Sequence, residues 1–521
     1  MGSLMTLTST SLHRARRERD LAALAGGEVV DVLIVGGGVT GAGAALDAAS
    51  RGLTVALVER GDLACGTSRW SSKLVHGGLR YLASGHVGVA LESARERGVL
   101  MERTARHLTR ALPLVLPLDA GASTWERRSG QAGLLAGDAL RLAVGTRRAT
   151  LPAPRRLSRA ETLRMAPGLH PGGLRGGLVT WEGQLTDDAR LVLAIARTAA
   201  GFGARIVTRC AATELASDGA HVRDECTGTA FDIRARAVIN ATGVWATDLS
   251  RNVRLRPSRG THLVVPAGRL GQPAAGVMVP VPGGPRRYVF ALPQPDGYAY
   301  VGLTDEPVTG MPDEVAEPAA YEIDFLLQTI NHVLETPLER VDVVGTFSGL
   351  RPLLDDAVHA RSADTSRRHR VVTGPDGVVT VVGGKLTTYR RMAEDAVGAA
   401  VAVHDLPAGS CPTTRLPLVG SAPPEELDRV DAPRRLVRRY GTEAPSVLAQ
   451  ARDEPELLSP LAPGWSVTGA ELMFGLRHEG ALDVDDLLDR RTRIGLVPAD
   501  RAHAGPVAAD IVAGELPRAL A

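Results

Sequence analysis

The amino-terminal region of the chain contains two short apolar runs separated by a stretch of small residues. The first run, VVDVLIV at 29–35, is β-branched and apolar, as in strands that are buried on both faces of a parallel sheet. The second, LTVALVE at 53–59, ends in an acidic residue. Between them we expect a helix of small residues, AGAALDAASRG at 42–52. The pattern predicts a complete β-α-β unit.

Further apolar runs recur later in the chain. Two of them, RAVINATG at 236–243 and GVVTVVGGK at 377–385, look like strands that run into glycine turns. From about residue 411 onward the pattern becomes helical and charged, and the proline-rich LPLVGSAPPEE marks the boundary. Three stretches between the two strands predict a separate antiparallel sheet: THLVVP at 261–266, RRYVFALP at 286–293 and GYAYVGLTD at 297–305.

Composition narrows the class of protein. A chain of 521 residues is too long for one compact core, so we expect two or three domains. Hydrophobic residues make up 44%, which excludes a disordered composition, and the formal charge of +2 gives no indication of nucleic-acid binding. No run of 18 or more apolar residues is present, so no membrane-spanning helix is expected. The chain has four cysteines: Cys65, Cys210, Cys226 and Cys411. They form no Cys-x-x-Cys pair, which argues against a structural zinc site or a disulfide scaffold.

A glycine-rich turn follows the first predicted strand, with the sequence GGGVTG at 36–41. In a dinucleotide-binding unit Gly36 permits the tight turn, Gly38 lets a pyrophosphate approach the helix N-terminus, and Gly41 allows close packing of helix and strand. Glu59 ends the next strand 18 residues after Gly41, where a carboxylate accepts from ribose hydroxyls. The alternative is a glycine-rich turn without a ligand.

The loop after the second strand, CGTSRWSSKLVHGGLRY at 65–81, is dense in hydroxyls and lacks helical or strand periodicity. We predict that it supplies donors to a diphosphate and to a flavin ring, the alternative being an ordinary polar connection. Only two of the 60 basic residues are lysines, and one of them, Lys73, lies in this loop. A lysine in a chain that otherwise uses arginine suggests a position where a compact ammonium is required. The predicted cofactor contacts are Thr67, Ser68, Ser72, Lys73, His76, Gly77 and Gly78.

The second lysine, Lys385, lies where a predicted strand ends and a helix opens, in GGKLTT at 383–388. Backbone N–H groups and the helix dipole at such a turn favour negative charge, as on a reduced flavin. Lys385 adds a point charge for the flavin or for an anionic substrate. The predicted cofactor contacts at this turn are Gly383, Gly384, Lys385, Leu386 and Thr387.

Four segments taken together carry a resemblance to a known family. They are the loop at 65–82, NATGVW at 240–245, FSGLRPL at 347–353 and VGGKLTTYR at 382–390. With them, the chain resembles the FAD-dependent glycerol-3-phosphate dehydrogenases over nearly its whole length, including its C-terminal RRYG and DDLLDRRTR segments. The resemblance implies FAD as cofactor and an α/β fold. That fold has a Rossmann-type doubly wound domain of the glycine/D-amino-acid-oxidase kind, an antiparallel substrate domain and a C-terminal helical domain.

The resemblance also implies roles for individual residues. His262, Arg351 and Lys385 are the implied catalytic residues, with His262 suited to general-base work by its ordinary pKa near neutrality. Implied substrate contacts are Arg80, Tyr81, Thr304, Arg351 and Arg367, with Arg368 adjacent, and implied cofactor contacts are Ala241, Gly243 and Trp245. The alternatives are structural salt bridges for the arginines, a core position for His262 and mere packing for Tyr81.

The implied reaction is oxidation of sn-glycerol 3-phosphate to dihydroxyacetone phosphate, with a membrane quinone as electron acceptor. An arginine cluster suits the substrate's phosphate dianion. One alternative is a glycerophosphate oxidase that uses dioxygen; another is a flavin-binding membrane scaffold or sensor without turnover. A homodimer also stays open.

Residues 101–160 hold eleven arginines against four acidic residues, interleaved with apolar runs. Such a segment can lie on an anionic bilayer surface, or it can be an amphipathic segment packed on the body of the protein. We therefore expect a cytoplasmic protein that is peripheral on the inner face of the cytoplasmic membrane.

The expected domains are an N-terminal extension (1–27), a discontinuous FAD domain (28–106, 161–255 and 340–405), a basic apolar segment (107–160), a substrate domain (256–339) and a helical domain (411–521).

Overall fold

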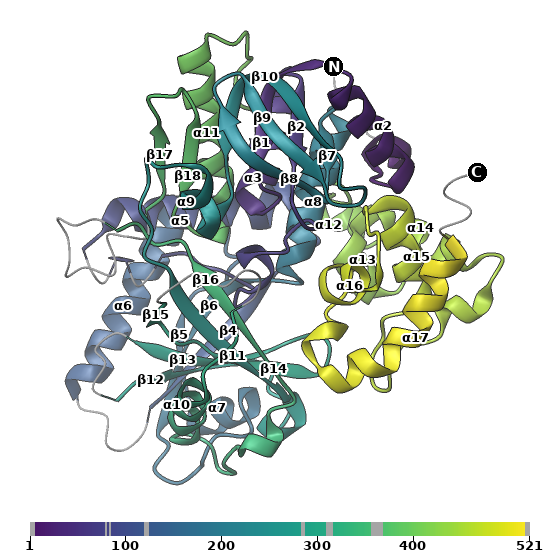
Figure 1. The fold of residues 1–521 in the computed structure, drawn as a ribbon. Helices are drawn as coiled ribbons and strands as arrows, with labels where there is room; N and C mark the ends of the chain where they lie inside the picture. The colour runs from purple at the N-terminus through teal and green to yellow at the C-terminus, as the bar shows by residue number, and fades with distance from the viewer. Residues whose placement is uncertain are drawn as a thin grey trace.

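The computed structural model places two β-sheets one above the other, with a helical C-terminal domain beside both (Figure 1). The residues that it describes are 6–78, 81–82, 85–118, 124–282, 287–308, 316–355 and 368–515.

The first sheet is the predicted nucleotide-binding sheet. Its central strand β1 (Val29–Val35) runs parallel to β2 (Val55–Val58) on one side and to β10 (Ala230–Asn240) on the other. The parallel order continues through β7 (Arg205–Val207) and β18 (Val379–Val382), and an antiparallel strand β17 (Arg370–Thr373) closes one edge. An antiparallel pair is attached to β10: β8 (Cys210–Ala216) and β9 (Gly219–Asp224).

Helices cover this sheet as the β-α-β pattern requires. α3 (Val39–Ser50) follows β1 and packs between α8 (Asp188–Gly201) and α11 (Tyr389–His404), so the predicted unit and its parallel strands are confirmed. The small residues of α3 are buried, and Gly43 lies so close to α11 that an added Cβ would come within 2.9 Å of the Tyr389 ring. On the other face lies α2 (Arg14–Ala25), with Leu24 in a separate apolar core.

The second sheet is mostly antiparallel, as predicted, and α10 (Ala320–Asn331) covers one of its faces. It extends beyond the expected range 256–339, because apolar strands from several other segments complete it. Strands within that range are β11 (Ser258–Pro266), β12 (Gly276–Pro280), β13 (Tyr288–Pro293), β14 (Tyr298–Gly302) and β15 (Glu306–Pro307). Strands from outside it are β3 (Leu74–Val75), β4 (Thr109–Leu118), β5 (Arg155–Leu157), β6 (Gly176–Leu185) and β16 (Gly345–Arg351).

The basic segment 107–160 is therefore divided between the sheet and its surroundings. β4 pairs along its whole length with β6, whereas the following helix α6 (Thr124–Ala143) and the turn after it carry exposed side chains. Leu135 and Leu142 of α6 are 69% and 58% exposed. Across the described residues, no helix has the length and apolarity needed to cross a bilayer.

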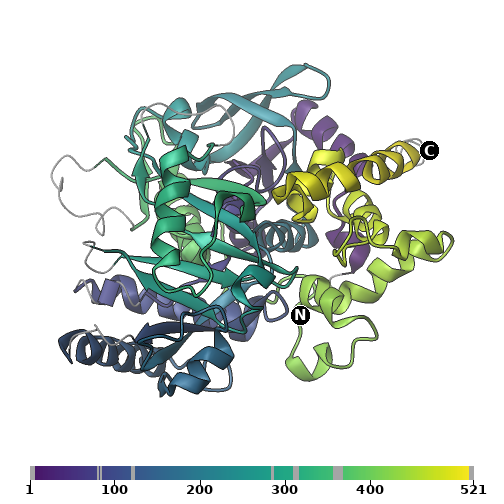
Figure 2. The ribbon, with the colours of Figure 1, turned by 90° about the horizontal axis from the view of Figure 1, so that it is seen from below.

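The C-terminal domain has its own apolar core, built from α15 (Gly469–His478), α17 (Pro498–Glu515) and the turns between them. Figure 2 shows it on the opposite side of the second sheet from α6. The domain contacts helix α8, which packs on the first sheet, through a buried ion pair, and strand β14 of the second sheet through a half-buried hydrogen bond. Arg190 of α8 donates to the Glu479 carboxylate, and the Tyr298 hydroxyl of β14 donates to Asp500.

Candidate active site

The glycine turn between β1 and α3 is closed by backbone contacts that leave no space for side chains. Gly36 has φ +111°, and a Cβ there would lie 2.6 Å from the carbonyl oxygen of Ala241. A Cβ on Gly41 would lie only 1.8 Å from the carbonyl oxygen of Gly36. The chain thus needs glycine at both positions, and the N-terminus of α3 opens directly above the turn.

Two predicted cofactor residues meet at this turn. The Val39 N–H, in the first turn of α3, donates to the Ser68 hydroxyl at 2.9 Å. Glu59 accepts from the Gly37 N–H at 2.6 Å and from the Gly61 N–H at 2.8 Å. A carboxylate at the end of β2 and donors at a helix N-terminus are the set that binds the ribose and pyrophosphate of a dinucleotide.

A buried indole N–H beside the turn also supports a dinucleotide as the ligand. The indole N–H of Trp245 is buried and has no acceptor among the residues that the structure describes. The Arg60 guanidinium lies over the Trp245 ring, 4.2 Å from its centroid. Trp245 follows the β10 strand end, where Ala241 closes the glycine turn and Gly243 has φ +63°. The turn, the carboxylate and this orphaned donor together fit FAD.

The loop at 65–78 crosses from the first sheet to the second. The Thr67 hydroxyl donates to the carbonyl of Leu350 in β16 at 2.7 Å, and the His76 N–H donates to the Thr387 hydroxyl at 3.1 Å. Ser72 Oγ and His262 Nε2 share a hydrogen bond of 2.8 Å. The structure thus brings together the predicted loop, the GGK turn and the predicted catalytic histidine.

Other members of this loop have structural partners. Lys73 is 1% exposed, and its ammonium contacts Asp188 at 2.8 Å and donates to the carbonyl of Arg69 at 2.6 Å. A Cβ on Gly77 would lie 2.2 Å from the Arg97 guanidinium, and a Cβ on Gly78 would lie 2.8 Å from the backbone of Ala90. Lys73 therefore acts within the protein as a buried ion-pair partner, and its predicted contact with the cofactor stays a prediction.

At the GGK turn, Gly383 and Gly384 have φ near +79° and +76°, and the chain then enters Leu386–Thr388 and α11. The Lys385 ammonium donates to the Ser93 hydroxyl of α5 (Val87–Val99) at 2.9 Å and lies 3.6 Å from the centroid of the Tyr81 ring. Tyr81 is itself buried in an apolar cluster. Tyr81 thus packs and also holds the lysine by a cation–π contact.

Lys385 opens onto a cavity of about 260 Å³ between α5 and the start of α11. Lys385, Arg368 and His369 bring basic groups to it, and Glu92 is the acidic side chain in its lining. Asp395 binds the His369 ring at 2.8 Å. A cavity lined by three basic side chains and one carboxylate suits an anionic ligand.

His262 is buried on β11, which pairs with β14 and β16 of the second sheet, and it stacks on Phe347 with ring centroids 4.6 Å apart. Burial, with the positive charges of Lys73 and Arg351, lowers the pKa of His262 to about 3. The expectation of a pKa near neutrality is wrong, because the imidazole is desolvated and faces two cations. His262 is therefore neutral at physiological pH, and its Nδ1 finds no hydrogen-bond partner in the described part of the chain.

Two further predicted residues lie beside His262 in a polar network. The Arg351 guanidinium contacts Asp305 and donates to Ser258 and to the carbonyl of Thr304. The Thr304 hydroxyl accepts from the Thr261 N–H at 2.9 Å and donates to Glu322 at 2.6 Å. In this arrangement the Thr304 hydroxyl both accepts a hydrogen bond from Thr261 and donates one to Glu322. Its predicted contact with the substrate therefore requires that one of these hydrogen bonds break. Arg80 and Arg367 lie outside the described residues.

Sequence reasoning did not identify Glu322, Ser93 or Phe347, which hold the predicted site residues in place. Glu322 is buried and binds Thr261, Thr304 and Arg259. It lies on α10, 18 residues from Thr304 and 61 residues from Thr261 along the chain, so short-range spacing does not link it to both. A glutamate at helical spacing from the buried Leu326 and Ile330 of the amphipathic helix AYEIDFLLQTIN was the available signal.

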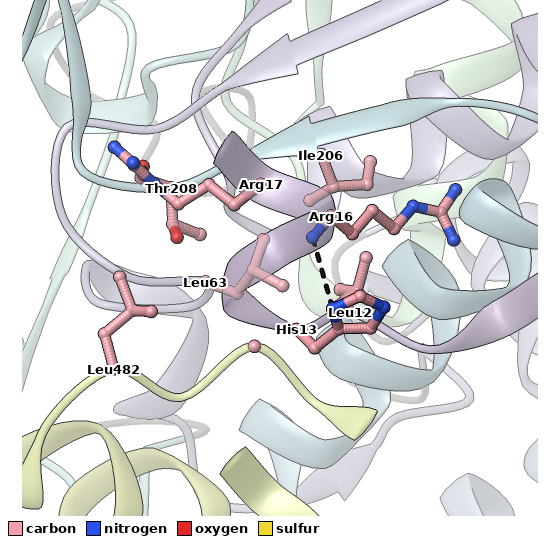
Figure 3. A pocket seen from close by; sticks show the side chains of 9 residues that line it. Leu12, His13, Arg16, Arg17, Leu63, Ile206, Thr208 and Leu482 are labelled. Carbon is pink, nitrogen blue, oxygen red and sulfur yellow. Dashed lines mark hydrogen bonds between the residues drawn. The ribbon is translucent and has the colours of Figure 1, made fainter. Parts of the chain in front are cut away.

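A second cavity lies between α2, β7 and the C-terminal domain (Figure 3). Leu12, Leu63 and Leu482 give it apolar walls, and Arg16 and Arg17 border it. The His13 imidazole caps α2 by accepting from the Arg16 N–H, and this cavity contains no predicted site residue.

The fold and the glycine cradle define the chain as an FAD-dependent oxidoreductase. The family model for "FAD dependent oxidoreductase" matches residues 31–390, and the model for "C-terminal domain of alpha-glycerophosphate oxidase" matches residues 411–518. More particularly, the chain belongs to the glycerol-3-phosphate dehydrogenase family of these enzymes, as its relatives show.

Similarity to those relatives extends over nearly the whole chain. Glycerol-3-phosphate dehydrogenase 1 of Mycobacterium tuberculosis is 51% identical over 510 residues, covering 97% of this chain and 99% of the relative. The glycerol-3-phosphate dehydrogenase of Mycobacterium leprae is 39% identical over 94% of this chain and 85% of its own length. A crystal structure of the Bacillus halodurans enzyme complexed with FAD has a TM-score of 0.74 and 27% identity, covering 97% of this chain and 94% of that one.

Proposed function

We propose that this enzyme oxidises sn-glycerol 3-phosphate at its secondary alcohol to dihydroxyacetone phosphate, with FAD as hydride acceptor and a membrane quinone as electron acceptor. The observation that carries the substrate assignment is the 51% identity, across almost the full length of both chains, to a relative named glycerol-3-phosphate dehydrogenase. FAD, when bound, accepts the hydride from C2 of the substrate and passes the electrons on.

The residues around Lys385 support binding of a phosphate dianion. Lys385 is fixed by Ser93 and by the Tyr81 ring, so its ammonium is preorganised, and Arg368 lies in the lining of the same cavity. A point charge held in advance loses little entropy when an anion binds. Arg80 and Arg367 remain predicted contributors to the same charge cluster.

His262 supports the proton transfer. Its imidazole is neutral, which is the form that accepts a proton, and Nε2 already shares a hydrogen bond with Ser72 Oγ. We propose that the C2 hydroxyl proton passes to His262, either directly when substrate takes the place of Ser72 or through the Ser72 hydroxyl. Arg351, whose charge acts on His262, positions the substrate's oxygens in this account.

The electron acceptor is tested by following turnover with and without a soluble quinone analogue in an oxygen electrode. The proposal expects dihydroxyacetone phosphate to form at a rate set by the quinone, with slow oxygen uptake when quinone is omitted. Fast oxygen uptake without quinone would instead favour a glycerophosphate oxidase. That alternative draws support from the match of residues 411–518 to an alpha-glycerophosphate oxidase domain.

We also propose that the enzyme is peripheral on an anionic membrane surface, on the cytoplasmic side, with α6 as the contact. Leu135 and Leu142 are exposed on this helix, and the exposed Arg147 and Arg148 follow it. Exposed apolar side chains beside basic ones are the combination that binds at a lipid headgroup boundary.

A further inference from the structure

The loop from Arg60 to Arg69 connects two groups that meet at the glycine turn. Glu59, just before it, accepts from the Gly37 N–H, and Ser68, near its end, accepts from the Val39 N–H. Inside the loop, the Ala64 N–H donates to the carbonyl of Gly37 at 3.0 Å, and Ala64 has φ +62°. Alanine in this left-handed conformation costs roughly 1 kcal/mol or more, so surrounding contacts must hold the loop in place.

The contact that holds it comes from the C-terminal domain. Asp62, near the start of the loop, is fully buried. Its carboxylate accepts from Arg490 Nε at 2.6 Å and from both terminal nitrogens of Arg491 at 2.6 and 2.9 Å. These arginines lower the pKa of Asp62 to about 2, so the carboxylate is ionised throughout the physiological range. We call Asp62, Arg490 and Arg491 the loop clamp.

A local departure from α-helical geometry presents the two arginines together. Leu487–Arg491 forms a π-helical turn, in which the Thr492 N–H donates to the carbonyl of Leu487 at 2.9 Å. Consecutive residues of a regular α-helix point about 100° apart, and the wider π-turn lets neighbouring side chains converge. Such turns occur frequently at functional sites.

The same turn reaches the loop at a second place. Asp489, next to Arg490, lies 3.8 Å from the Arg69 guanidinium, one residue beyond Ser68. The remaining donors of Arg491 bind the carbonyl of Glu479, which ties the clamp to the body of the C-terminal domain. Three consecutive residues of this domain therefore contact Asp62, near the start of the loop, and Arg69, at its end.

We infer that the C-terminal domain controls FAD affinity through the loop clamp, with Asp62, Arg490 and Arg491 as positioning residues for Glu59 and Ser68. The inference rests on FAD binding and not on the identity of the substrate. The clamp itself does not touch the glycine turn, so its effect on FAD passes through the backbone of residues 60–69. A purely structural interdomain ion pair would stabilise the fold without changing the FAD dissociation constant of the folded protein.

The test measures the FAD dissociation constant of the apoprotein by flavin fluorescence, together with its thermal unfolding midpoint. The variants are Asp62→Asn, Arg490→Gln and the conservative Arg490→Lys. The matched control is Arg477→Gln, because Arg477 pairs with Glu515 inside the same domain, at 2.7 and 2.8 Å, and contacts no part of the loop. Losing one partner of a buried ion pair is costly, so we expect Asp62→Asn and Arg490→Gln to weaken FAD binding about tenfold or more.

Arg490→Lys should recover much of the affinity, and Arg477→Gln should bind FAD as the wild type does. If Asp62→Asn does not fold, Arg490→Gln decides the question, since Arg491 still pairs with Asp62. A folded Arg490→Gln protein with the wild-type dissociation constant overturns the inference. So does an equal loss of affinity in Arg477→Gln, which would mean that the domain acts through general stability.

Discussion

His262 is held neutral by its surroundings, and that fixes what it can contribute to the reaction. A buried imidazole that faces Lys73 and Arg351 has a pKa of about 3, so the proton-accepting form persists far below neutral pH. From the sequence the residue was predicted to be a base, which stays a prediction, and its lowered pKa was not predicted. Burial and the two facing cations come from segments distant along the chain, and no local pattern reports them.

The first prediction concerns pH. Because the folded pKa is lowered, protonation removes the base only under strongly acidic conditions. The rate of flavin reduction by substrate should therefore show no fall near pH 6.5, the ordinary value for histidine. Stopped-flow reduction across pH is the measurement. A decline centred near pH 6.5 in the wild type that disappears in His262→Gln would show that His262 titrates near its ordinary pKa and would contradict the lowered value.

Removing the imidazole gives the second prediction. His262→Ala should slow flavin reduction by about 10²–10⁴-fold, the usual range for loss of a general base, and leave substrate binding largely intact. Ser72→Ala, which removes the hydrogen-bond partner of His262, should slow it less. If His262→Ala reduces its flavin at nearly the wild-type rate, this histidine is a core residue and the base is another group.

Arg351 gives the third prediction, because two roles are open to it. As a substrate contact, its loss in Arg351→Ala should weaken substrate binding by about 10–100-fold, equivalent to a charge-assisted hydrogen bond of about 1.5–3 kcal/mol. As a structural partner of Asp305 alone, it should lower the unfolding midpoint and leave binding unchanged. Arg340→Ala, which removes an exposed pair with Asp324, is the control and should change neither quantity.

At the scale of elements, the strand–turn–helix pattern at residues 29–59 was sufficient to predict the nucleotide-binding unit. Glycines at fixed spacing and a run of β-branched residues are local signals, and they reflect close backbone contacts such as the one between Gly41 and Gly36. The second sheet was predicted less completely. β4 contains Pro113 and Pro117 and lies in an arginine-rich segment, and β3 has two residues, so neither stands out as a strand without its partners.

The glycine turn gives the fourth prediction. Gly41→Ala should abolish FAD binding or prevent folding, because its Cβ would lie 1.8 Å from a backbone oxygen that cannot move away alone. Gly398→Ala, in α11, meets nothing within 4 Å and should instead stabilise the protein by about 0.5–1 kcal/mol. Bound flavin and the unfolding midpoint report both variants. An FAD-replete Gly41→Ala protein of wild-type stability would refute the packing argument.

α6 gives the fifth prediction. Binding to anionic liposomes should weaken with salt and with joint neutralisation of Arg127, Arg128, Arg147 and Arg148, since screening acts on exposed charges. The side chains of Arg127 and Arg128 lie outside the described residues. Neutralising the exposed Arg429 and Arg434 of the C-terminal domain is the control and should have little effect. Liposome binding that does not change with salt concentration, or no liposome binding, would argue against an electrostatic contact.

At the scale of the whole molecule, the sequence predicted a flavin fold with a substrate sheet and a helical cap, and the family comparisons confirm that architecture. It did not predict how the cap is joined to the rest. Asp62 and Arg491 are separated by 429 positions, and only the folded chain shows that they form one buried cluster. Local sequence patterns do not predict which charged residues pair when they are far apart along the chain.

The central claim is that this chain transfers a hydride from sn-glycerol 3-phosphate to FAD, and anaerobic titration tests it most directly. The FAD-loaded protein is mixed with sn-glycerol 3-phosphate in the absence of oxygen and quinone, and with glycerol in a parallel control. We predict that the flavin absorbance bleaches with the phosphorylated substrate and stays unchanged with glycerol, because we propose that the cationic cavity at Lys385 binds the phosphate. A flavin that dithionite reduces but sn-glycerol 3-phosphate leaves oxidised would contradict the account.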